Sequence, residues 1–158
     1  MNNNSLAAES SFGLRHCFDE SGHGNTPQLP LTHYDSLRIL LVSDDMQSAA
    51  RLKRTLQGLG YSETLVAYSG KRALGAVTEY SPVVAIVDLD LSDMTGYSLA
   101  GSLRVHTALQ VRQLPLIAVA ERAEFATGEL ARAAGFLGVL TKPINAWLLN
   151  GLLATSLM

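Results

Sequence analysis

From residue 37 onward, short runs of apolar residues alternate with longer segments in which apolar and polar residues are interleaved. Short, continuous apolar runs fit strands that are buried on both faces of a parallel sheet. The pattern therefore predicts five strands. They are Leu37–Val42, Glu63–Ala67, Val83–Val87, Leu116–Val119 and Phe136–Leu140.

Between these runs, apolar residues recur at every third or fourth position, which is the spacing of a helix with one buried face. In the first of these segments, Ala49, Leu52 and Leu56 share such a face. Gly60 and Gly135 follow the first and fourth segments and favour the end of a helix. The predicted helices are Asp45–Leu59, Gly70–Tyr80, Tyr97–His106, Phe125–Ala134 and Ile144–Leu153.

Regular alternation of strands and helices predicts an α/β fold, because each helix carries the chain back so that the next strand runs parallel to the last. We expect a doubly wound, five-stranded parallel sheet of the flavodoxin-like type, with strand order 2-1-3-4-5. In such open sheets the functional site lies at the carboxyl ends of the strands. The candidate chemistry of this chain should therefore follow its strands.

The first part of the chain differs from the rest in composition. Residues 1–35 are rich in Asn, Ser, Gly and Pro, and they show no sustained period of 2 or 3.6. Such a composition is typical of a flexible segment. We therefore predict a flexible N-terminal tail over residues 1–35 and a single domain over residues 36–158.

Composition and charge narrow the class of protein. The chain has 158 residues, 47% of them hydrophobic, which is typical of a globular domain. Lys and Arg number 12 and Asp and Glu 14, giving a net charge of −2, which argues against a nucleic-acid partner. The single cysteine, Cys17, excludes an intrachain disulfide. Without a signal peptide or a long apolar run, we expect no membrane partner and a cytoplasmic location.

Acidic residues cluster at the predicted strand ends. Asp44 and Asp45 follow the first strand, Asp88 follows the third, Asp90 comes two residues later, and Lys142 follows the fifth strand. Carboxylates that meet in one pocket repel each other unless a cation joins them, and oxygen ligands suit Mg²⁺. A carboxylate beside Mg²⁺ and an ammonium group is a plausible nucleophile toward phosphorus. The pattern favours a Mg²⁺-dependent site.

These residues, in these places, resemble the receiver domain of response regulators from two-component signal transduction systems. The resemblance runs from Leu37 to about Leu153. The matching segments are ILLVSDD (39–45), YSGKRAL (68–74), VVAIVDLDLSDMTGYSL (83–99), LPLIAVA (114–120) and ARAAGFLGVLTKPI (131–144).

The resemblance implies a role for each acidic residue and for the lysine. Asp88 would accept a phosphoryl group from a sensor histidine kinase or phosphotransfer protein in a phosphorelay. Asp44, Asp45 and Asp88 would hold Mg²⁺, together with the backbone carbonyl of Asp90. Lys142 would contact the phosphoryl group. The expected protein is a stand-alone signalling domain rather than an enzyme, acting through protein–protein contacts with an unknown downstream protein.

Two positions depart from the family pattern. Receivers usually carry Thr or Ser at the end of the fourth strand, where this chain has Ala120. They usually carry an aromatic residue three positions before the lysine, where this chain has Val139. These departures keep open an alternative, a pseudo-receiver that works as a binding module without phosphorylation.

Two further alternatives come from other classes. The segment Asp88-Leu89-Asp90-Leu91-Ser92 looks like the nucleophile motif of haloacid-dehalogenase-type phosphatases, although that motif normally follows the first strand. Flavodoxins share the expected strand order but cradle a phosphate in the loop after the first strand. Here Asp44 and Asp45 occupy that loop, and their charge would repel a phosphate.

Overall fold

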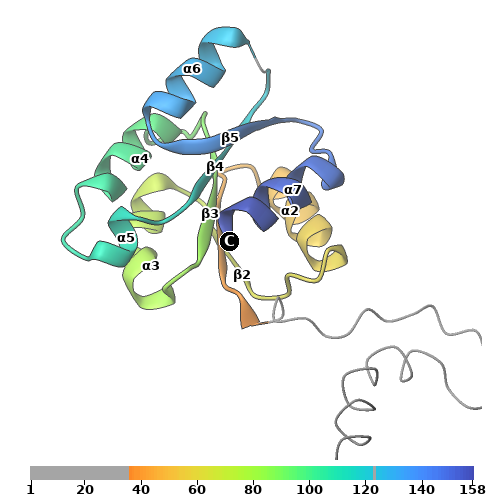
Figure 1. Cartoon of the computed structure of the whole chain (residues 1–158), viewed down its shortest axis with the longest axis horizontal. Helices are drawn as coiled ribbons and strands as arrows, with labels where there is room; N and C mark the ends of the chain where they lie inside the picture. The colour runs from red at the N-terminus through yellow and green to blue at the C-terminus, as the bar shows by residue number, and fades with distance from the viewer. Residues whose placement is uncertain (1–35, 123) are drawn as a thin grey trace, which may run out of the picture.

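The computed structural model describes residues 36–122 and 124–158. The flexible tail predicted for residues 1–35 lies outside these described residues, so this prediction and the domain boundary at residue 36 stay untested. The described residues form one parallel sheet of five strands (Figure 1). Its strands are β1 (Ile39–Val42), β2 (Thr64–Ala67), β3 (Val84–Asp88), β4 (Leu116–Ala120) and β5 (Phe136–Thr141).

The strand order is β2-β1-β3-β4-β5, and every neighbouring pair is parallel, which confirms the predicted topology. In this register Asp88 lies opposite Val119, and Ala120 lies opposite Thr141. The carboxyl ends of β3, β4 and β5 therefore reach the same edge of the sheet. Side chains that follow these strands are brought together there.

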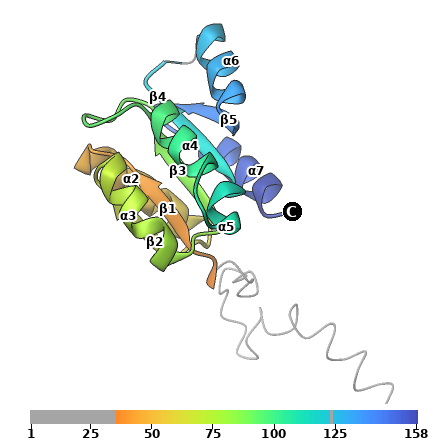
Figure 2. The same cartoon turned by 90° about the vertical axis from the view of Figure 1, so that its left-hand side faces the viewer.

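Helices cover both faces of the sheet (Figures 1 and 2). They are α2 (Met46–Gly58), α3 (Gly70–Tyr80), α4 (Gly96–Arg104), α5 (Leu109–Arg112), α6 (Phe125–Ala133) and α7 (Ala146–Ser156). The buried residues of α2 and α7 belong to one core cluster, and those of α3, α4, α5 and α6 belong to the other. Among the described residues, no helix is long and apolar enough to cross a membrane.

The strands supply both core clusters because successive side chains of a strand point to opposite faces. In β1, Leu40 and Val42 pack on the side of α3 and α4, whereas Ile39 and Leu41 pack on the side of α2 and α7. All four residues of β1 are buried, as are all five of β3 and of β4. This double burial explains why these strands read as continuous apolar runs.

The elements differ from the sequence prediction mainly at their ends. Helix α5 was not predicted, because four residues are too few to show a helical period. Helix α7 begins two residues later than predicted because Asn145 caps it, accepting hydrogen bonds from the amides of Trp147 and Leu148. Strands β3 and β4 extend one residue further than predicted, to Asp88 and Ala120.

A close approach of α4 to β3 requires glycine at position 96. A Cβ atom at Gly96 would lie 2.8 Å from the carbonyl oxygen of Asp88 and 2.9 Å from Cα of Leu89. Both are backbone atoms, so neither can turn aside. Gly101, in the same helix, has no such neighbour within 4 Å. The start of α4 can therefore pack directly against the backbone of Asp88.

We expect Gly96→Ala and Gly101→Ala to change stability in opposite directions. The first should destabilise the fold by about 1–3 kcal/mol, because the new methyl group displaces the backbone at the end of β3. The second should stabilise it by about 1 kcal/mol through helix propensity. Urea unfolding of both variants measures the two free energies. A stability of Gly96→Ala equal to or above that of the wild type would show that the close approach does not constrain position 96.

Candidate functional site at the carboxyl edge of the sheet

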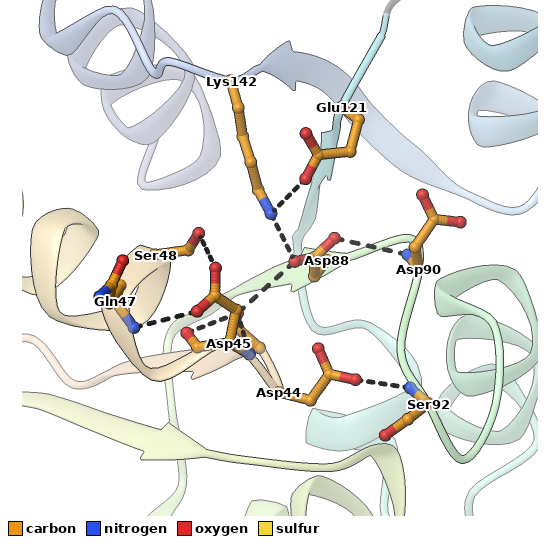
Figure 3. Close-up of polar contacts among 10 residues, drawn as sticks. Asp44, Asp45, Gln47, Ser48, Asp88, Asp90, Ser92, Glu121 and Lys142 are labelled. Carbon is orange, nitrogen blue, oxygen red and sulfur yellow. Dashed lines mark hydrogen bonds and ion pairs between the residues drawn. The ribbon is translucent and has the colours of Figure 1, made fainter.

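Asp88 is the buried centre of the site (Figure 3). As the last residue of β3, it presents its carboxylate at the edge of the sheet. The Oδ2 atom accepts a hydrogen bond from Lys142 Nζ at 3.0 Å and one from Ser43 Oγ at 3.5 Å. The backbone amide of Asp90 donates to Oδ1 at 3.4 Å. The structure thus brings together Asp88 and Lys142, as predicted.

Lys142 reaches Asp88 from the loop after β5, and its peptide bond to Pro143 is cis. Its ammonium group forms ion pairs with Asp88 and also with Glu121, each at 3.0 Å. Partial burial disfavours the charged lysine, but the hydrogen bonds and charges of the two carboxylates outweigh it, so the pKa of Lys142 is raised. A buried carboxylate needs such a partner, and Asp88 has it.

Glu121 is a site residue that the sequence analysis missed. It directly follows β4, and Ala120 before it pairs with Thr141 of β5 in the sheet register. Its carboxylate therefore lies near Lys142 at the same edge. The sequence does contain a signal for Glu121. It is an acidic residue directly after the fourth strand, and the same position after a strand indicated Asp44 and Asp88 as site residues. The family pattern had drawn attention to Ala120 instead.

The acidic pair is held by protein donors. Asp45 caps α2, accepting hydrogen bonds from Ser48 Oγ at 2.6 Å and from the amide of Gln47 at 3.1 Å. The hydroxyl of Ser48 and then the amide of Gln47 lower the pKa of the Asp45 carboxyl. Asp44 accepts a 2.7 Å hydrogen bond from the amide of Ser92, in the loop after β3.

This arrangement bears on metal binding. Asp44, Asp45 and Asp88 supply the oxygen ligands that Mg²⁺ prefers, and all three lie at one edge of the sheet. Their carboxylates, however, turn toward different protein donors, to Ser92, to the start of α2 and to Lys142 (Figure 3). Within residues 36–122 and 124–158, no group of three or more Asp, Glu, His or Cys side chains is arranged to hold a metal. The donor chemistry fits Mg²⁺, whereas the present rotamers do not assemble the ligands.

Two hollows flank the Asp88–Lys142 pair. A groove of about 420 Å³ runs from the pair along α2, with Arg51 and Arg54 among its lining residues. On the other side, a hollow of about 310 Å³ is lined by Asp90, Glu121 and Arg122, among others. Asp88 and Lys142 both line the groove along α2, so they are accessible from that side.

The two departures from the family pattern are visible in the packing. Ala120 is buried at the end of β4, and its methyl group has no atom that could form a hydrogen bond with a phosphoryl group. Val139 is partly buried in β5 and packs against the core cluster that contains α3 to α6. No hydroxyl or aromatic ring therefore occupies either position.

The loop after β3 is anchored to α3. Asp93 accepts hydrogen bonds from the amides of Gly70 and Lys71, at 3.0 Å and 2.9 Å, at the start of that helix. These bonds, first that from Lys71 and then that from Gly70, lower the pKa of Asp93. Because Ser92 of the same loop donates to Asp44, the loop connects the start of α3 to the acidic pair that follows β1.

Comparison with known proteins identifies the family of this fold and site. The model of the response regulator receiver domain matches residues 39–153. The chain is 32% identical over 107 residues to the transcriptional regulatory protein KdpE of Mycobacterium tuberculosis, covering 68% of this chain and 45% of that protein. It is 32% identical over 107 residues to an uncharacterized 14.6 kDa protein of Leptolyngbya boryana, covering 68% of this chain and 79% of that protein.

A solved structure agrees. The chemotaxis response regulator CheY4 of Vibrio cholerae superposes with a TM-score of 0.68 and 26% identity, covering 76% of this chain and 98% of that one. The chain belongs to the receiver domain family of two-component response regulators. The receiver family is a signalling domain and not a classical enzyme, which decides against the phosphatase alternative, and membership of this family decides against a flavodoxin. The chain spans about half the length of KdpE.

We expect Asp93→Asn to destabilise the fold at neutral pH, because a neutral amide is a weaker cap for α3. The native pKa of Asp93 is depressed, so its contribution is present above the unfolded pKa of about 3.9 and is lost as the pH falls through the native pKa. The difference in unfolding free energy between wild type and variant should therefore approach zero at acidic pH.

Urea unfolding between pH 7 and pH 2 measures this difference. Asp90→Asn is the matched control, because no residue in the described part of the chain donates a hydrogen bond to the exposed Asp90 carboxylate. A difference that stays constant with pH would contradict the assignment of the Asp93 carboxylate as a charged cap.

Proposed function

We propose that this protein is a receiver that accepts a phosphoryl group on Asp88 from a sensor histidine kinase or a phosphotransfer protein. The observation that carries the proposal is the buried Asp88 carboxylate at the end of β3, 3.0 Å from the ammonium of Lys142. A carboxylate held beside a fixed cation, in a groove that both residues line, suits attack on an incoming phosphoryl group.

In the proposed transfer, an oxygen of Asp88 forms a bond to phosphorus. The bond between phosphorus and the donor atom breaks, and its electron pair leaves on the donor, which is a histidine nitrogen in a kinase or an acetate oxygen in acetyl phosphate. Lys142 holds a phosphoryl oxygen and offsets the charge that develops there. The groove along α2 is the proposed approach for the donor, because it opens directly onto Asp88 and Lys142.

We further propose that Asp44, Asp45, Asp88 and the backbone carbonyl of Asp90 hold Mg²⁺ when the ion is present. The ion would supply positive charge for the phosphoryl oxygens. Asp45 would have to exchange its hydrogen bonds to Ser48 and Gln47 for the ion, so metal binding and the cap of α2 compete for one carboxylate.

Signalling would proceed through contacts with an unknown downstream protein. A stand-alone form is supported by the relative from Leptolyngbya boryana, a 14.6 kDa protein aligned along 79% of its length. The net charge of −2 is the reason for proposing no nucleic-acid partner. The cytoplasmic location and the lack of a membrane partner stay predictions.

The pseudo-receiver is the second candidate. It is favoured by the engaged carboxylates of Asp44 and Asp45 and by the methyl group of Ala120. In that case the same fold would bind a partner without phosphorylation. The two candidates differ in whether Asp88 forms an acyl phosphate.

The first experiment treats the protein with acetyl phosphate and Mg²⁺ and detects the added phosphoryl group by mass spectrometry. Asp88→Asn should abolish labelling, because an amide is not nucleophilic. Lys142→Ala should slow labelling, and Ser98→Ala, an exposed position on α4 outside the site, should keep it as the control. Labelling that persists in Asp88→Asn would overturn the assignment of Asp88, and absent labelling of the wild type would favour the pseudo-receiver.

The second experiment titrates Mg²⁺ at millimolar concentration and follows the amide shifts of the site by NMR. Asp45→Ala should abolish the response. Ser48→Ala should strengthen Mg²⁺ binding several-fold, because it removes the hydroxyl donor that holds the Asp45 carboxylate. The exposed Ser98→Ala is the control. If the wild-type amides do not respond, the acidic residues are not a metal site.

A further inference from the structure

One ammonium group at the site serves two carboxylates. Lys142 Nζ lies 3.0 Å from Asp88 Oδ2 and 3.0 Å from Glu121 Oε1 (Figure 3). The three residues come from the ends of three neighbouring strands, β3, β4 and β5. Two negative charges thus share a single cation.

The two carboxylates differ in exposure. The Asp88 side chain is 5% exposed, the Glu121 side chain is 66% exposed, and Lys142 lies between them at 20%. Asp88 cannot leave the lysine without becoming an unpaired buried charge, which is costly. Glu121 can turn into water at little cost, because an exposed ion pair contributes little free energy. Glu121 is therefore the partner that can be displaced.

A phosphoryl group on Asp88 upsets this balance. The acyl phosphate carries more negative charge than the carboxylate it replaces, and its oxygens are strong hydrogen-bond acceptors. A phosphoryl oxygen and the Glu121 carboxylate bound to the same ammonium group would repel each other. The side chain of Ala120, the residue before Glu121, offers no hydrogen-bonding atom, so Glu121 is the first side chain after β4 that can respond to the new charge.

We propose that Glu121 is a displaceable competitor for Lys142: it holds the lysine before phosphorylation and is released when the phosphoryl group takes its place. This inference rests on the proposed phosphoacceptor function. Glu121 acts through Lys142 and is thus a positioning residue, and it slows phosphorylation because the lysine must first exchange partners. Its release changes where the negative charge lies in the hollow that Glu121 lines with Asp90 and Arg122, and so changes the surface that a partner protein would contact.

The kinetic test compares wild type, Glu121→Gln and Glu124→Gln, treated with acetyl phosphate and Mg²⁺. Gln keeps the shape of residue 121 but removes its charge, so the rate constant for phosphorylation should rise several-fold. Glu124 is exposed, lies three residues further on and makes no ion pair in the described part of the chain, so its variant should match wild type. An unchanged rate in Glu121→Gln would overturn the inference while leaving the phosphoacceptor function intact.

A spectroscopic test reports the release itself. With Mg²⁺ present, addition of beryllofluoride, a phosphoryl mimic, should move the side-chain carboxyl ¹³C resonance of Glu121 toward that of a solvated glutamate and leave that of Glu124 in place. Beryllofluoride should also bind several-fold more tightly to Glu121→Gln than to wild type. A Glu121 resonance that stays fixed while the site amides respond would overturn the inference. If neither beryllofluoride nor acetyl phosphate acts on any variant, the proposed function fails and the inference fails with it.

Discussion

The ion pair between Asp88 and Lys142 is the contact on which the site depends. Asp88 is a buried charge at the end of a strand that is otherwise apolar, and an unpaired charge there would destabilise the fold. Lys142, in a loop 54 residues further along the chain, provides the opposite charge and a hydrogen bond to Asp88. The pair links β3 to β5 across β4 and places a nucleophile and a cation side by side.

Hydrogen bonds to the neighbouring carboxylates fix the loops at this edge of the sheet. Asp44 accepts from the amide of Ser92, Asp45 caps α2, and Asp93 accepts from the first two amides of α3. Each carboxylate thus has a structural role in this state of the protein. Asp44 and Asp45 are also the proposed metal ligands. The same carboxylate oxygens therefore form the present hydrogen bonds and would bind the metal ion. Glu121 and Asp88 likewise compete for Lys142. The site is arranged so that incoming charge must displace existing partners.

The competition for Lys142 offers a way to signal without the hydroxyl group and the aromatic ring that receivers usually use. Ala120 and Val139 lack the hydroxyl and the ring that the family commonly carries at these positions. A charged side chain that follows Ala120 by one residue can respond to a phosphoryl group through electrostatics alone. Such a response needs no repacking of the core, and it would be weakened by salt because Glu121 is exposed.

The sequence by itself determined the fold class and the edge at which the site lies, because double burial and helical periodicity follow from the order of apolar residues. The strand order does not follow from this periodicity alone, and it was expected from the flavodoxin-like type of sheet. It also pointed to Asp88 and Lys142 through their places after β3 and β5. Only the tertiary structure decided which carboxylate meets which donor. Asp45 turning to Ser48, and Lys142 shared with Glu121, depend on side-chain directions between distant segments, which no local pattern records.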